Sequence, residues 1–149
     1  MLDQNLDHFL AAAVTSVLET MFFSEALGPC DPSENESDLR TRLAFSGEVS
    51  GYFAVRICGS SARSMAASFL GEIDDLVTET QTGEAICELT NILCGSVLSK
   101  LGCRECFDLG SPELLSAGID HLTCTPACQQ SFAVEKGTMT VSLFMSASA

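Results

Sequence analysis

Hydrophobic and polar residues repeat along this chain with two different periods, and the helical period marks three segments. Residues 6–23 carry large apolar side chains three or four positions apart, which predicts an amphipathic helix. The same period returns over residues 60–70 and, for longer, over residues 83–101. Either Ser60 or Ser61 can cap the second of these helices.

A strict alternation of apolar and polar positions, typical of strands, fills much of the remaining chain. It runs over residues 39–45 and 52–58, which predict one antiparallel hairpin, and over residues 129–135 and 138–145, which predict a second. Residues 107–109 indicate a further short strand. The order α-β-β-α-α-β-β-β predicts an α/β fold of the α+β type, with helices packed on a mainly antiparallel sheet.

Length and composition agree with a single domain over residues 1–149. A chain of 149 residues, 46% of them hydrophobic, can bury a full core and is not disordered as a whole. Residues 24–38, which include proline, glycine and small polar residues, are expected to form a surface loop. The sequence contains no internal repeat and no low-complexity tract.

The charge balance restricts the partners of this protein. The formal net charge is −13, with only seven Lys and Arg residues. Because so few cations cannot build a basic patch, nucleic acid and anionic membrane surfaces are excluded as partners. The first ten residues lack the cationic region of a signal peptide, and the apolar stretches are too short to span a bilayer. We therefore expect a soluble cytoplasmic protein.

Eight cysteines leave three interpretations open. Four of them, with CxxC and CxxxC spacings, resemble the halves of a zinc site: Cys103, Cys106, Cys124 and Cys128. His121 lies close by in the sequence. The other cysteines are scattered, and free cysteine commonly behaves as a small buried hydrophobe. We expect reduced structural thiols and no bound metal, with a zinc site and a disulfide as the alternatives.

The longest helical segment has an apolar side and a polar side. At about 100° per residue, four polar or small residues fall within about 40° of one line along the helix: Glu84, Glu88, Asn91 and Gly95. A glycine inside a helix costs about 1 kcal/mol relative to alanine, and close approach of another backbone or of a bulky partner is one reason to keep it. Exposed Glu and Asn residues are commonly just solvated, so spacing alone assigns no function.

The surrounding sequence resembles the CheC/CheX/FliY family of chemotaxis phosphatases, and more narrowly its CheX branch. The family motif is an acidic residue or Ser, three residues, Glu, two residues, Asn, and a downstream Pro. Four residues fill it here: Glu84, Glu88, Asn91 and Pro112. Glu84 stands where Asp or Ser is more usual, and Pro112 comes slightly early. In the first helix Phe22 stands where a second motif would have Asn, so the resemblance implies one active site per chain.

The resemblance implies a hydrolase that removes the aspartyl phosphate of a CheY-like response regulator. In this role Asn91 orients the attacking water, because an amide both donates and accepts hydrogen bonds. Glu88 binds the active-site Lys of the regulator, and three residues contact the partner: Glu84, Gly95 and Pro112. The Mg²⁺ lies in the regulator's own active site, so no cofactor of this chain is expected.

The sequence also leaves open other roles for Glu88 and for the whole chain, and the resemblance implies an oligomeric state. Glu88 as a general base is a competing role, but an exposed carboxylate is a weak base at neutral pH. A non-catalytic adaptor that binds a response regulator through the same helix face is one alternative function, and a Cys-dependent metal or redox module is another. The resemblance also implies a homodimer paired through sheet edges, with residues 138–145 as an edge strand.

Overall fold

The computed structural model describes residues 2–22, 27–30, 38–47, 50–100, 108–115 and 126–146 of the chain. Helices in this part are α1 (Leu2–Met21), α2 (Gly59–Leu70), the short 3₁₀ helix η1 (Asp74–Leu76) and α3 (Glu79–Lys100). Strands are β1 (Gly28–Pro29), β2 (Leu39–Ser46), β3 (Ser50–Ile57), β4 (Asp108–Leu109), β5 (Glu113–Leu115), β6 (Cys128–Val134) and β7 (Gly137–Ser146).

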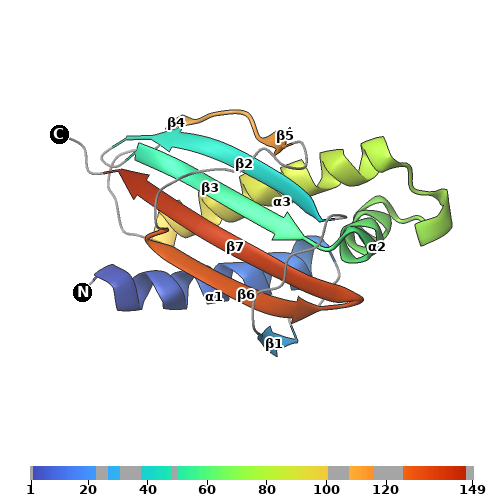
Figure 1. Cartoon of the computed structure of the whole chain (residues 1–149), viewed down its shortest axis with the longest axis horizontal. Helices are drawn as coiled ribbons and strands as arrows, with labels where there is room; N and C mark the ends of the chain where they lie inside the picture. The colour runs from blue at the N-terminus through green and yellow to red at the C-terminus, as the bar shows by residue number, and fades with distance from the viewer. Residues whose placement is uncertain are drawn as a thin grey trace.

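The strands form one antiparallel sheet with the helices gathered on one side. Its order is β1-β6-β7-β3-β2-β4, and β5 also pairs with β2. In Figure 1, α1 and α3 cross behind the sheet, while α2 lies at one of its ends. The predicted α+β architecture and the predicted order of helices and strands are therefore confirmed.

Strand alternation decides which residues face the helices. In β2 the buried positions are Thr41, Leu43 and Phe45, whereas Arg42 and Ala44 lie on the other face. The core between sheet and helices is built from such positions together with the apolar sides of α1 and α3. Glycine is required at one central position, because a Cβ on Gly51 would lie 1.8 Å from the carbonyl oxygen of Phe144 on β7.

The start of α2 differs from the prediction. Neither Ser60 nor Ser61 caps the helix, because the N-cap position is Cys58, whose side chain makes no capping hydrogen bond. Ser61 lies in the first turn, and its hydroxyl donates to the carbonyl oxygen of Glu135 instead, at 2.7 Å. The helix ends where Gly71 adopts a left-handed conformation with φ of 70°.

The start of α3 also differs, because the helix begins at Glu79, four residues before the predicted boundary. Thr78 and Gln81 form a reciprocal capping box: each backbone N–H donates to the other's side-chain oxygen at 3.0 Å. Residues 79–82, which precede the predicted helix, are therefore the first turn of the helix that carries the candidate site.

The strand order corrects the predicted edge. Residues 138–145 lie in β7, which is paired with β3 on one side and β6 on the other, so this strand is interior. Within the part of the chain that the structure describes, the outermost strands are β1 at one edge and β4 and β5 at the other. β1 is a small addition inside the segment expected to be a loop.

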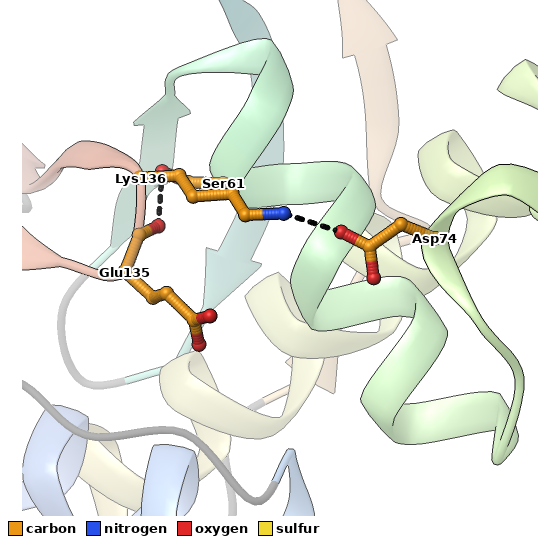
Figure 2. Close-up of polar contacts among 4 residues, drawn as sticks. All are labelled: Ser61, Asp74, Glu135 and Lys136. Atoms are coloured by element: carbon orange, nitrogen blue, oxygen red, sulfur yellow. Dashed lines mark hydrogen bonds and ion pairs between the residues drawn. The ribbon is translucent and has the colours of Figure 1, made fainter.

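The turn between β6 and β7 is anchored to the helical end of the molecule. Figure 2 shows Ser61 bonded to Glu135 and the ammonium group of Lys136 paired with the Asp74 carboxylate at 2.8 Å. Asp74 begins η1, which leads directly into α3. The hairpin thus fixes the segment from which α3 starts.

Candidate functional site

The candidate site lies on the side of α3 that faces away from the sheet. The opposite side is fully buried in the core through Ile86, Leu89, Leu93 and Val97. Glu84 and Glu88 are exposed, and Asn91 and Gly95 are half-buried. The helix therefore brings these four predicted residues onto one accessible face.

Residues 108–115, here called the β4–β5 segment, run beside this face. A Cβ on Gly95 would lie 4.0 Å from the Cδ1 atom of Leu109, and a Cβ on Gly83 would lie 3.1 Å from the Cδ2 atom of Leu114. Higher residue numbers in the segment thus meet lower numbers in α3, so the two run antiparallel.

Pro112 lies in the β4–β5 segment between Leu109 and Leu114, the two residues that lie against α3. Leu109 pairs with Phe45 on β2, and Glu113, the residue after Pro112, pairs with Arg42. Pro112 is half-buried, and its role beside the helix face stays a prediction.

The β4–β5 segment is held in place by the sheet. The backbone N–H of Gly110 donates to the carbonyl oxygen of Ala44 at 2.8 Å. The Arg42 guanidinium binds the Glu113 carboxylate at 3.1 Å and lies 5.0 Å from the ring centroid of Tyr52. These contacts fix β5 on β2, and β2 in turn packs on α3.

Three residues at the site were not predicted. Leu109 and Leu114 are 38% and 50% exposed and flank the polar face at its two ends. Their signal in the sequence was the pair of short apolar segments around Pro112. Cys87 lies one turn from both Glu84 and Asn91 and is half-buried. Burial, and secondarily the negative charge of Glu84, raise the pKa of the Cys87 thiol, which keeps it protonated at neutral pH.

The described functional groups at this face are the Glu84 and Glu88 carboxylates, the Asn91 amide and the protonated Cys87 thiol. Among the described residues, no three His, Cys, Asp or Glu side chains are grouped as a metal site. Three of the proposed zinc ligands, Cys103, Cys106 and Cys124, lie outside the described residues, as does His121. The fourth, Cys128, is buried, and its thiol donates to an Asp7 carboxylate oxygen at 2.9 Å.

The first helix carries no comparable pair. Phe22, which stands where a second motif would have Asn, is fully buried just after α1 and stacks on the Phe69 ring at 4.7 Å between centroids. Glu19 is exposed. Phe22 is therefore a core residue, and the Glu-x-x-Asn pair lies on α3.

Fold and site together define a class of protein: an antiparallel sheet covered on one side by two helices, one of which presents a solvent-facing Glu-x-x-Asn pair. The family model for the chemotaxis phosphatase CheX matches residues 41–134, and the chain belongs to the CheX family. A comparison with curated proteins finds no match.

Solved structures of CheX proteins share the fold. The chemotaxis protein CheX from Vibrio vulnificus is 20% identical, with a TM-score of 0.76 over 95% of this chain and 96% of that chain. CheX from Desulfovibrio desulfuricans is 23% identical, with a TM-score of 0.73 over 95% and 99%. The CheX–CheY–BeF₃–Mg²⁺ complex from Borrelia burgdorferi is 19% identical, with a TM-score of 0.69 over 93% and 96%. At these identities the likeness establishes the fold.

Among the helices that the structure describes, none combines the length and the apolar character that crossing a bilayer requires.

Proposed function

We propose that this protein hydrolyses the aspartyl phosphate of a CheY-like response regulator, using the face of α3 that carries Glu88 and Asn91. Membership of the CheX phosphatase family supports the reaction. The complex from Borrelia burgdorferi, in which a CheX protein of the same fold binds CheY, supports the class of partner. The observation that carries the assignment is the exposure of Glu88 beside a half-buried Asn91 on one helix face.

Asn91 acts on the water in this proposal. Its carboxamide neither ionises nor attacks, but it donates one hydrogen bond and accepts another, which orients a water molecule in line with the phosphorus–oxygen bond. The water oxygen bonds to phosphorus, the regulator's carboxylate leaves, and inorganic phosphate is released. A Gln performs the same service in small GTPases.

Glu88 has a docking role in this proposal. Its exposed carboxylate pairs with the active-site Lys of the regulator as the two proteins meet, which sets the register of Asn91 against the phosphoryl group. The Mg²⁺ is part of the phosphorylated regulator, which is the substrate, so this chain needs no cofactor of its own.

The remaining face residues complete the contact with the regulator. Glu84 adds negative charge one turn before Glu88, and Gly95 leaves room one turn after Asn91. Pro112 gives the neighbouring segment a fixed backbone shape, because its ring restricts φ. We further propose that the protein acts in the cytoplasm as a homodimer paired through its outer strands.

The direct test is a phosphate-release assay with a panel of purified CheY-like regulators. Each regulator is phosphorylated by a small-molecule donor in Mg²⁺, and its dephosphorylation is timed with and without this protein. Acceleration of at least one regulator, saturable in regulator concentration, is expected. Saturable binding without acceleration would identify an adaptor, and neither binding nor acceleration across the panel would contradict the proposal.

A further inference from the structure

A pair of buried hydroxyl groups joins α3 to the sheet directly beneath the candidate site. Thr90 lies between Glu88 and Asn91 in α3 and is fully buried, and Thr41 on β2 is 1% exposed. The two side-chain oxygens are hydrogen-bonded to each other. The other buried side chains of α3 around Thr90 are apolar: Leu89, Leu93 and Cys94.

The direction of this hydrogen bond follows from counting protons. The Thr90 hydroxyl donates its single proton to the carbonyl oxygen of Ile86 at 2.8 Å. It therefore has no proton left for Thr41, so Thr41 is the donor and Thr90 the acceptor. The resulting chain runs from the sheet through Thr90 to the helix backbone.

A hydrogen bond is directional, so it can fix the rotation of α3 on the sheet, which aliphatic packing alone leaves free. Leucine and isoleucine side chains tolerate small rotations of a helix on a sheet, whereas a buried hydroxyl loses its partner when the helix turns, which is costly. With side-chain tips about 5–6 Å from the helix axis, a rotation of 10° moves the tip of Asn91 by about 1 Å. A misplacement of that size can cost a reaction about a hundredfold.

We propose that Thr41 and Thr90 are positioning residues for the phosphatase reaction: their bond sets the rotation of α3 on the sheet and so aims Asn91 and Glu88. This inference rests on the proposed function for its kinetic part. Its structural part, the fixed rotation of α3, stands apart from catalysis.

Thr41→Val is the most informative variant. It keeps the shape of the side chain and removes the hydroxyl that donates to Thr90. The Thr90 hydroxyl still donates to the carbonyl oxygen of Ile86, so the variant leaves no buried donor without an acceptor. Thr140→Val is the matched control, because Thr140 is also a sheet threonine, 3% exposed, and bonded at 2.8 Å to Ser131 rather than to a helix. Thr41→Ser restores a hydroxyl at the same position.

The kinetic measurement separates positioning from simple loss of stability. Thr41→Val should lower kcat about tenfold with KM nearly unchanged and with a melting temperature close to that of Thr140→Val. Thr140→Val should keep the wild-type kcat, and Thr41→Ser should recover most of it. A wild-type kcat in Thr41→Val, or an equal loss in Thr140→Val, would overturn the positioning role.

A second readout keeps the test decisive if the protein shows no phosphatase activity. Nuclear magnetic resonance of isotope-labelled protein reports the side-chain amide of Asn91 and the backbone amides of α3. Thr41→Val should shift or broaden these signals, and Thr140→Val should leave them unchanged. Unchanged α3 signals in a folded Thr41→Val protein would overturn the inference. Shifted signals in a protein without phosphatase activity would support the structural role of the Thr41–Thr90 hydrogen bond and contradict only the proposed reaction.

Discussion

Gly95 lies on the accessible face of α3 for a reason that the described part of the chain does not supply. A Cβ added there would meet only the Cδ1 atom of Leu109, at an ordinary contact distance of 4.0 Å. This differs from Gly51 in β3, where a Cβ would collide with the backbone of β7. Room for a partner is the explanation that we propose for glycine at position 95.

Gly95→Ala should separate stability from partner binding. The substitution should leave the free energy of unfolding unchanged or raise it by up to about 1 kcal/mol, because alanine is the better helix former. The melting temperature should therefore stay the same or rise. Affinity for the phosphorylated regulator should fall, measured by titration calorimetry or from KM. A marked loss of stability, or unaltered affinity, would show that the glycine is not kept for a partner.

Glu84 and Cys87 provide a chemical probe of the same face. Because the negative charge of Glu84 contributes to the raised pKa of the Cys87 thiol, Glu84→Gln should lower that pKa and speed alkylation of Cys87 at fixed pH. Cys94, buried and with a pKa raised to about 12, should remain inert in both proteins. Peptide mass spectrometry after timed iodoacetamide treatment measures both rates, and equal Cys87 rates in the two proteins would contradict the placement of Glu84.

At the level of helices and strands, the sequence predicted element types well and their boundaries less well. The alternation around Leu43 and the period around Leu89 identified a strand and a helix because burial on one face imposes those patterns. The capping box of Thr78 and Gln81 was legible as Thr-x-x-Gln but lies in a polar stretch without apolar period, so the start of α3 was placed late.

Strand order was less accessible than strand identity. β7 looked like an edge because its alternation does not reveal how many neighbours it has. The pairing of β6 with β1 and of β2 with β5 joins residues far apart in the sequence, and no local pattern encodes them. The candidate site shows the same limit. The helical period of α3 was enough to place Glu88 and Asn91 on one face, whereas the positions of Leu109 and Leu114 beside that face became visible only in the tertiary structure.

The Lys136–Asp74 pair between the β6–β7 turn and η1 predicts a pH-dependent contribution to stability. The hydrogen bond from Lys136 lowers the pKa of Asp74, and the same bond raises the pKa of Lys136. The contribution is therefore present near neutral pH. It is lost as the pH falls through the lowered pKa of Asp74, and again as the pH rises through the raised pKa of Lys136.

Lys136→Met should therefore melt slightly below the wild type near neutral pH, and the difference should close in strong acid and in strong base. Both groups are exposed, so the shift is expected to be small and to shrink with added salt. Thermal unfolding of both proteins across a pH series measures it. A difference that is the same at every pH would show that the ion pair does not contribute.

For the whole molecule, pairing through the outer strands favours a dimer, whereas the negative net charge opposes it. With β7 interior, the strands available for pairing in the described part of the chain are β1 on β6 and the short β4 and β5 on β2. The net charge of −13 repels a second copy, so salt should favour the dimer. Light scattering at high micromolar concentration should give the mass of two chains, more completely in added salt, and a monomeric mass throughout would contradict the homodimer.

The central claim is that Asn91 acts in the transition state and Glu88 in docking, and paired kinetics of two variants test it most directly. Asn91→Ala should lower kcat for the phosphorylated regulator about a hundredfold, roughly 3 kcal/mol, with KM nearly unchanged. Glu88→Gln should instead raise KM and weaken the salt dependence of the reaction, because it removes a charge pair. Glu72→Gln, an exposed glutamate outside α3, is the charge-matched control, and melting curves should agree among all four proteins. A wild-type kcat in a folded Asn91→Ala protein would contradict the account.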